Sequence, residues 1–251
     1  MSALADTPPT VHESAGPGAT AGILAYLQDR RLQPGDRLPS ERDLAMRLGV
    51  GRNAIREAVA TLTTLRMVES RPNSGIYLRR FETDSSFEAL VMLTELGNVP
   101  SASDVAEAME VRAHLETQAV TLACERRTDE DHARLRRIVE RTADLLEAGG
   151  NTAQADTDFH LAVVQATHNL VLVRMLGAFY RFTARRREAL FFRDLTQARA
   201  SLDEHRALAD HILARDAVAA RELILRHMAR ASHYWDSVLN TPPNRSRTTH
   251  D

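Results

Sequence analysis

Residues 38–80 read LPSERDLAMRLGVGRNAIREAVATLTTLRMVESRPNSGIYLRR, and this stretch decides the fold of the N-terminal part of the chain. Apolar residues recur at helical spacing on both sides of a short Gly-Val-Gly break, and two short alternating runs follow. This order predicts a helix, a tight turn, a second helix and a β-hairpin. Such a layout is that of a winged helix-turn-helix, a fold that reads DNA.

The neighbouring elements support this interpretation. A helix is expected over residues 20–31, with Ile23, Leu24 and Leu27 on its apolar face. Ser40 is a candidate N-cap for the next helix, and Asp43 stands at the third position beyond it, as in a capping box. The second helix is expected over residues 53–66. Strands are expected at residues 67–70 and 76–78, joined by a turn at residues 71–75.

The charge is divided unevenly along the 251 residues. Residues 21–80 contain 11 Arg against six acidic residues, whereas residues 81–251 contain 21 Arg against 26 acidic residues. The overall net charge of −2 hides this contrast. A basic segment joined to an acidic one fits a nucleic-acid module attached to a second domain.

The single cysteine, Cys124, excludes an internal disulfide, and its helical, apolar context predicts a buried thiol. The N-terminus lacks the basic and then apolar pattern of a signal peptide. No stretch reaches the roughly 18 apolar residues that span a bilayer. We therefore expect a cytoplasmic protein with no membrane partner.

The whole chain is predicted to be mainly α, with a C-terminal all-α bundle of six or seven helices. The expected divisions are a disordered tail at 1–18, the winged helix-turn-helix at 19–80, a linker with a short helix at 81–100, the bundle at 101–240 and a tail at 241–251. Helices of the bundle are expected at 104–127, 129–148, 152–167, 170–193, 202–214 and 217–239. A polar break is expected at residues 196–201.

The start of the second helix should carry the DNA-reading residues, because the N-terminal end of a recognition helix faces the base edges. Arginine matches the O6 and N7 atoms of guanine, and asparagine matches N6 and N7 of adenine. A residue early in the preceding helix can reach the backbone or a base, and the hairpin turn can enter the minor groove or follow phosphate. The candidates are Arg42, Gly51, Arg52, Asn53, Arg56, Arg71, Asn73 and Gly75.

In the acidic part, Asp156 and His160 are four residues apart and share one helix face. His205 and His227 follow later in the chain. One carboxylate and three imidazoles suit Zn, Ni or a similar divalent ion. The alternative is that these are ordinary surface or core histidines, which is the commoner fate of a helical histidine.

The N-terminal segment resembles the DNA-binding domain of the GntR family of bacterial transcription regulators. The matching pieces are PGDRLPSER, the LGV turn and R-x-x-I-R-E-A at residues 52–58. The resemblance implies that Arg42, Arg52 and Arg56 contact DNA and that Gly75 lies at the wing tip. Two departures are Gly51, where the family usually has Ser or Thr, and Asn73, where it has the first Gly of a G-x-G. Asparagine tolerates positive φ, so the turn can survive.

The segments EVRAHLETQAVTLACERRT, DTDFHLAVVQATHN, EHRALADHILARDAVAAREL and RHM resemble the FCD-type ligand-binding domain of the FadR branch of that family. The resemblance implies that Asp156, His160, His205 and His227 are metal ligands, with Zn expected first and Ni or Mn as alternatives. Asp158 is offset by two residues and is the weaker carboxylate candidate.

The same resemblance assigns two residues to the effector. It implies that Arg112 faces a cavity and meets a carboxylate effector, for which the planar guanidinium is well suited. The alternative is an internal helix pair between Arg112 and Glu116. Asn169 either points at the pocket or caps a helix.

Taken with the motifs, these patterns predict a homodimeric transcription regulator, a repressor, that binds a palindromic site in double-stranded DNA. A small organic acid held by Arg112 and the metal would be its effector. One alternative keeps DNA binding but makes the metal purely structural. A metal-dependent hydrolase is the other alternative. The sequence argues against it, because it shows no separately placed general base.

Overall fold

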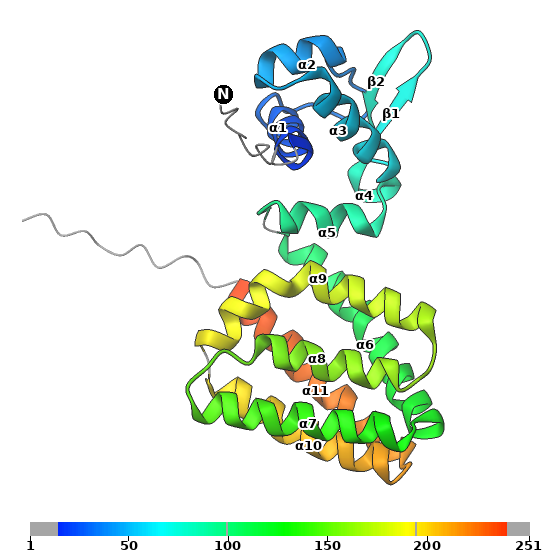
Figure 1. Ribbon diagram of the computed structural model, residues 1–251, viewed down its shortest axis with the longest axis vertical. Helices are drawn as coiled ribbons and strands as arrows, with labels where there is room; N and C mark the ends of the chain where they lie inside the picture. The colour runs from blue at the N-terminus through cyan, green and yellow to red at the C-terminus, as the bar shows by residue number, and fades with distance from the viewer. Residues whose placement is uncertain (1–14, 99, 194, 240–251) are drawn as a thin grey trace, which may run out of the picture. The chain divides into compact units, whose positions relative to one another are not determined.

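The computed structural model describes residues 15–98, 100–193 and 195–239, and its fold is mainly helical as predicted (Figure 1). Residues 1–14 and 240–251, which hold most of the predicted N-terminal tail and all of the C-terminal one, lie outside the described residues. The chain divides into two compact units between Leu90 and Val91.

The first unit contains three main helices, a two-stranded hairpin and a single helical turn. These are α1 (Ala15–Asp29), α2 (Glu41–Leu48), α3 (Arg52–Thr64), β1 (Val68–Arg71), β2 (Gly75–Leu78) and α4 (Phe81–Asp84), and the unit boundary falls within α5 (Phe87–Glu95). Helix α3 packs on α1, α2 and β1. Its buried face is built from residues at helical spacing, Ala54, Ile55, Ala58, Val59 and Leu62.

The helix-turn-helix is shaped by its caps. The predicted N-cap is confirmed, since Ser40 Oγ accepts the backbone N–H of Asp43 at 3.2 Å. Helix α2 ends at Gly49, whose φ of 66° is the left-handed conformation that glycine adopts without penalty. Gly51 is the N-cap of α3 and provides no side-chain hydrogen bond. The two caps turn the chain from α2 into α3 over three residues.

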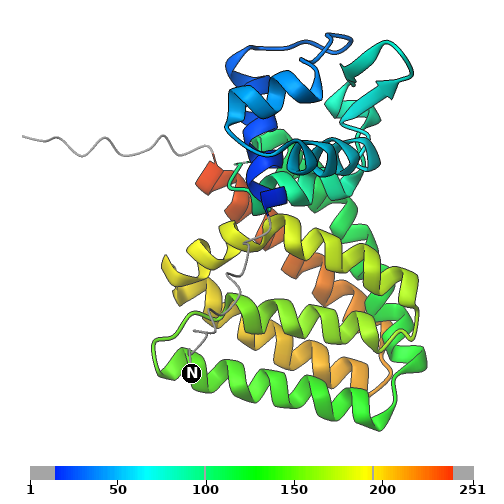
Figure 2. The same cartoon turned by 45° about the horizontal axis from the view of Figure 1, so that its top comes forward.

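The hairpin projects from the helices of its unit as a wing (Figure 2). Val68 pairs with Leu78 and Arg71 with Gly75 in antiparallel register. The preceding segment adds to the sheet, because Leu38 donates its N–H to the carbonyl of Ile76 at 2.8 Å. The wing is thus anchored to the loop that precedes α2.

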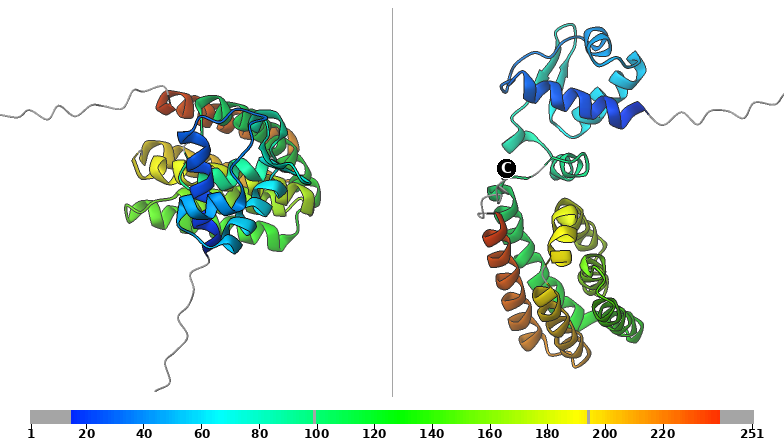
Figure 3. Two further views of the ribbon diagram at one scale, coloured as in Figure 1. Left: turned by 90° about the horizontal axis from the view of Figure 1, so that it is seen from above. Right: turned by 90° about the vertical axis from the view of Figure 1, so that its left-hand side faces the viewer.

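The second unit is a bundle whose helices contact one another in a closed ring. They are α6 (Ala102–Arg126), α7 (Asp129–Glu147), α8 (Ala153–Gln165), α9 (Leu170–Arg193), α10 (Leu195–Leu213) and α11 (Ala217–Leu239). Contacts run from α6 to α9, α8, α7, α10, α11 and back to α6. In Figure 3, α6 and α11 run side by side in one layer and α8 and α9 form another. Capping boxes start α6 at Ser101 and α7 at Thr128.

The bundle encloses one apolar core. Val120, Leu135, Phe159 and Ile212 are fully buried, and they come from α6, α7, α8 and α10. Cys124 is also buried, and burial raises the pKa of its thiol to about 11. The thiol therefore stays protonated and packs as an apolar group, as its sequence context predicted.

Three helix predictions need correction. Helix α1 begins at Ala15, so residues 15–18 of the predicted tail are helical, and Ala19 and Ile23 are fully buried one turn apart. Helix α4 was not predicted, because a single turn is too short to show a period. Helix α10 begins at Leu195 instead of residue 202, since Ala198 and Ser201 of the supposed polar break are buried.

Candidate nucleic-acid interface and metal centre

The predicted recognition residues lie exposed at the start of α3. Arg52 and Asn53 are its first two residues, and both are exposed. Arg56 follows one turn later, with Nε 3.3 Å from Oε2 of Glu41 on α2. Arg42 is exposed on α2, with Nε 3.7 Å from Oδ1 of Asp43. Exposed arginine donors at a helix N-terminus are suited to phosphate and base edges.

The wing carries the second group of predicted DNA residues. Arg71 Nε lies 3.0 Å from Oε1 of Glu69, and the guanidinium stacks over the Tyr77 ring at 4.3 Å. Asn73 has φ 59°, so the left-handed conformation expected of this position is present. Tyr77 and Glu69 therefore brace Arg71 at the base of an exposed turn.

Gly75 shows why the wing tip requires glycine. Its φ is 126°, and a Cβ built there would lie 2.7 Å from Nε of Arg37. Sequence reasoning missed Arg37, which is exposed beside the turn. Arg37 belongs to the PGDRLPSER segment that carries the family resemblance, and this membership is the signal that could have identified it as a further cation of the candidate interface.

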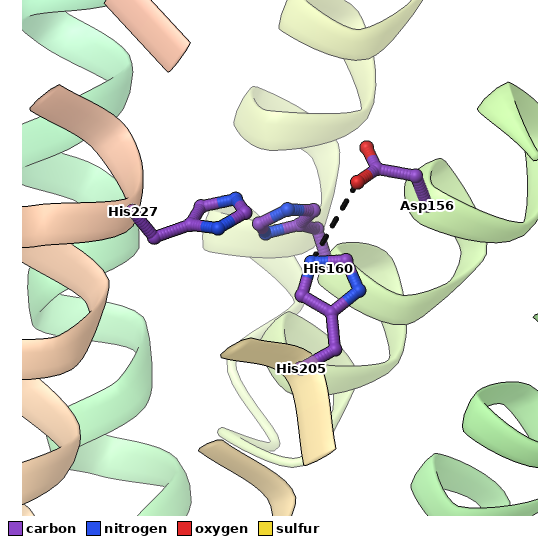
Figure 4. Close-up of side chains that lie close together, drawn as sticks. All are labelled: Asp156, His160, His205 and His227. Carbon is purple, nitrogen blue, oxygen red and sulfur yellow. Dashed lines mark ion pairs between the residues drawn. The ribbon is translucent and has the colours of Figure 1, made fainter. Parts of the chain in front are cut away.

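The four predicted metal ligands converge inside the bundle (Figure 4). Asp156 and His160 come from α8, His205 from α10 and His227 from α11, and all four are buried. One potential ligand atom from each residue lies within 4.8 Å of those of the other three.

The three imidazole rings form a nearly equilateral triangle. Their centroids are 5.0 Å apart for His160 and His205, and 5.1 Å apart for the two pairs with His227. Oδ1 of Asp156 lies 3.6 Å from Nε2 of His205. Four donors in this arrangement can surround one cation without help from distant residues.

The chemistry of these donors fits a divalent cation. Nε2 of His160 is buried and has no hydrogen-bond partner among the described residues. A buried polar atom without a partner is costly unless something binds it. Burial lowers the pKa of His227 to about 4, against the opposing effect of Glu204, so this ring is neutral at pH 7. Neutral imidazoles and a carboxylate are the ligands that Zn, Ni and Mn accept.

Two glutamates contact these histidines. The sequence had not linked either glutamate to the candidate metal site. Nδ1 of His160 lies 3.2 Å from Oε2 of Glu116 on α6, and Nδ1 of His227 lies 2.6 Å from Oε2 of Glu204 on α10. Burial opposes the ionised form of Glu204, but hydrogen bonds from His227 and Arg230 lower its pKa to about 2. Glu204 is adjacent to a predicted ligand in sequence, while its contact with His227 depends on tertiary structure.

Arg112, the predicted effector residue, is buried beside the histidine cluster. Its Nε donates to Oε1 of Glu116 at 3.2 Å, and its NH2 group donates to the Tyr180 hydroxyl, which in turn donates to Glu116. Burial opposes ionisation of Glu116, but the neighbouring His160 and Arg112 hold the pKa of its carboxyl well below the usual range. The internal pair that the sequence left open is thus present, and it is linked to a candidate ligand.

The two remaining candidates do not join the cluster. Oδ1 of Asn169 accepts the backbone N–H groups of Val171 and Leu172 at 3.1 and 3.2 Å, so Asn169 caps α9. Of the two roles that the sequence left open for Asn169, the structure shows the cap. Asp158 pairs with Arg141 on α7 and is absent from the histidine cluster, as its offset predicted.

No helix in the described part of the chain combines the length and the apolar character needed to cross a membrane.

Comparison with known proteins agrees with this architecture. The family described as bacterial regulatory proteins, gntR family, matches residues 19–78, and the FCD domain matches residues 107–230. A putative L-lactate dehydrogenase operon regulatory protein of Escherichia coli K12 is 33% identical, over 82% of this chain and 81% of its own. The transcriptional regulator LutR of Bacillus subtilis is 29% identical, over 80% and 92%.

A solved structure supports the fold alone. It belongs to Lar, described as controlling the agr system of Listeria monocytogenes, and it is 17% identical with a TM-score of 0.63. The match covers 93% of this chain and 100% of the other.

Proposed function

This chain belongs to the GntR family of bacterial transcription regulators, in the FadR-like branch that carries an FCD domain, and from that membership we propose how it works. We propose a homodimeric repressor that binds a palindromic operator and responds to a small carboxylate through a metal-containing helical domain. The observation that carries the proposal is the convergence of three imidazoles and a carboxylate beside a buried arginine.

The DNA-binding half of the proposal rests on α3 and the wing. Arg52, Asn53 and Arg56 are exposed at the N-terminal part of α3, where a recognition helix meets base edges. Arg42 and Gly51 flank that end, and the wing provides the remaining contacts, Arg71, Asn73 and Gly75. Membership of a family of DNA-binding regulators favours this role over hydrolysis by the histidine cluster.

Fluorescence anisotropy with double-stranded fragments from the region upstream of the protein's own gene tests this half. We expect Arg52→Ala to abolish specific binding, because it removes the guanidinium best placed to read a base. Arg136→Ala, an exposed arginine of α7, is the charge-matched control and should bind like the wild type. Wild-type affinity in the Arg52 variant would place the recognition residues elsewhere.

The proposed dimer matches the proposed symmetry of the operator. A palindromic site presents two half-sites, and each recognition helix reads one, so two chains are required. Light scattering of the free protein and titration against a half-site should give a dimer and a large loss of affinity for the half-site. A monomer that binds the half-site as tightly as the full site would contradict this part.

The metal half of the proposal assigns the ion to Asp156, His160, His205 and His227, with Zn first and Ni or Mn as alternatives. Elemental analysis of the untagged protein, before and after EDTA, identifies the ion and its stoichiometry. We expect chelation to lower the melting temperature, because an ion that binds only the folded state stabilises it by mass action. Unchanged stability and no metal in the preparation would argue against the site.

The effector half assigns the carboxylate contact to Arg112. An effector carboxylate would compete with Glu116 for the guanidinium and approach the metal at the same time. Effector and DNA binding are then reciprocally coupled, so a carboxylate that weakens operator binding must itself bind less well to the DNA complex. In this proposal the effector releases the repressor from its operator.

A panel of small acids separates effector sensing from a purely structural metal. L-lactate is included because the Escherichia coli relative is named for an L-lactate dehydrogenase operon. A carboxylate that raises the melting temperature of the metal-loaded protein and lowers its operator affinity supports sensing. Loss of stability on chelation, with no response to any acid, would leave only the structural role.

A further inference from the structure

Two of the three clustered histidines contact glutamates from neighbouring helices. His160 on α8 meets Glu116 of α6, with Nδ1 3.2 Å from Oε2, and His227 on α11 meets Glu204 of α10, with Nδ1 2.6 Å from Oε2. In both cases the contact uses the ring nitrogen Nδ1.

Each glutamate is in turn held by an arginine. Nε of Arg112 lies 3.2 Å from Oε1 of Glu116, and Nε of Arg230 lies 3.2 Å from Oε1 of Glu204. The same chain of contacts, from arginine to glutamate to histidine, therefore occurs twice around one cluster.

Further contacts fix the second of these chains in place. The NH1 group of Arg230 donates to Oε1 of Gln197 at 2.6 Å. Its NH2 group donates to Oγ of Ser201 at 3.1 Å and also to Oε2 of Glu204. Helices α10 and α11 are joined by this set. The carboxylate of Glu204 therefore has little freedom to leave Nδ1 of His227.

These pairings determine which ring nitrogen carries the proton. A carboxylate paired with a guanidinium is an acceptor only, so the imidazole nitrogen facing it must donate. Nδ1 of His227 also lies 3.4 Å from the NH2 group of Arg230, which can only donate, but Oε2 of Glu204 at 2.6 Å is the closer partner. The proton is therefore assigned to Nδ1 of both His160 and His227. The other nitrogen, Nε2, is left with its lone pair, and in His160 this atom is buried without a hydrogen-bond partner among the described residues.

We propose that Glu116 and Glu204 are positioning residues of the metal centre, each holding its histidine as the Nδ1–H tautomer so that Nε2 is presented to a divalent cation. The proposal rests on the metal site proposed above and adds two residues that do not touch the ion. Carboxylates behind metal-bound histidines orient the ring and raise its basicity, and their loss typically weakens metal affinity about 10- to 100-fold.

Glu204 offers the cleaner test, because Glu116 also contacts the proposed effector residue. In Glu204→Gln, the amide keeps the size of the side chain but can present an N–H to the ring. The matched control is Asp203→Asn, since Asp203 is the adjacent acid, is exposed and pairs with Arg206. Zinc affinity of the untagged full chain is measured by competition with a chelating dye.

We expect about 10- to 100-fold weaker zinc binding in Glu204→Gln and wild-type binding in Asp203→Asn. Equal affinity in Glu204→Gln and the wild type would overturn the positioning role while leaving the metal site intact. A wild-type protein that binds no divalent ion would overturn the metal site itself, and the inference with it. If Glu204→Gln does not fold, Glu116→Gln with Glu110→Gln as its exposed control tests the other pair.

A second measurement separates positioning from general support of the fold. The ¹⁵N shifts of labelled histidines in the metal-free protein report the tautomer of each ring. We expect Nδ1–H for His160 and His227 in the wild type, and loss of that single tautomer for His227 alone in Glu204→Gln. A wild-type His227 protonated on Nε2 would overturn the proposal whatever the zinc affinity.

Discussion

Arg112 and Glu116 lie one turn apart on α6 and form an ion pair that is almost completely buried, with Nε 3.2 Å from Oε1. An exposed pair at this spacing contributes only a few tenths of a kcal/mol. Burial changes this balance, because loss of one partner leaves the other charge in the interior. The pair also contacts His160 through Glu116, so its integrity bears on the candidate metal site.

Arg112→Ala should therefore destabilise the protein strongly. The buried carboxylate of Glu116 would lose its ion-pair partner, and removal of one partner from a buried pair typically costs about 3–5 kcal/mol. Urea unfolding of the metal-free protein measures the change. Arg136→Ala, which breaks an exposed pair at the same spacing with Glu140, is the control and should change the free energy of unfolding by less than about 1 kcal/mol. A similar small change in both variants would contradict the argument.

The sequence indicated the ligands of the candidate metal site but not the residues behind them. Asp156 and His160 share a helix face, and their spacing alone brings them together. His205 and His227 were candidates by residue type, and the family resemblance joined them to this pair, since nothing local links α10 and α11 to α8. The contact between Glu204 and His227 depends on how those helices pack, and no periodicity within one helix encodes it.

Asn169→Ala should destabilise the bundle without affecting the response to carboxylates. Its Oδ1 accepts two backbone N–H groups at the start of α9, and loss of such a cap costs about 1 kcal/mol. Thermal or urea unfolding measures the loss, and Asn169→Asp should restore most of it because a carboxylate also caps. A variant of normal stability that no longer responds to an effector would instead indicate that Asn169 contacts the effector.

The fold was predictable where local patterns and packing agree. The spacing of the apolar residues in α3 indicates its buried face, and Ser40 with Asp43 marks the start of α2. Helix α10 began earlier than expected, because burial of Ala198 and Ser201 outweighs the polar character of their neighbours. A polar segment can be helical when a few of its residues face a core, and only the tertiary structure shows that they do.

Gly75→Ala should destabilise the wing and weaken DNA binding. The residue has φ 126°, a backbone conformation that residues with a side chain rarely adopt. The new Cβ would also displace the exposed Arg37 side chain, whose Nε lies 2.7 Å away. A strained backbone position of this kind costs about 1–3 kcal/mol. Gly18→Ala is the control, since that glycine has ordinary helical backbone and no atom within 4 Å of the new Cβ. Unfolding and operator anisotropy measured on both variants test the prediction, and equal behaviour would show that the wing accommodates the methyl group.

Gly51→Ser should improve both stability and operator binding. Gly51 is the N-cap of α3 with extended backbone, φ −67° and ψ 149°, and a Cβ there meets nothing within 4 Å. A serine can therefore adopt this conformation and accept a free N–H of the first turn, which is worth a few tenths of a kcal/mol over glycine. Its hydroxyl would also lie at the helix end that faces phosphate in the proposed complex. Gly51→Ala provides the control, because it adds the Cβ without the hydroxyl. If serine and alanine give the same operator affinity in anisotropy measurements, the hydroxyl makes no contact with DNA and this end of α3 lies away from the backbone.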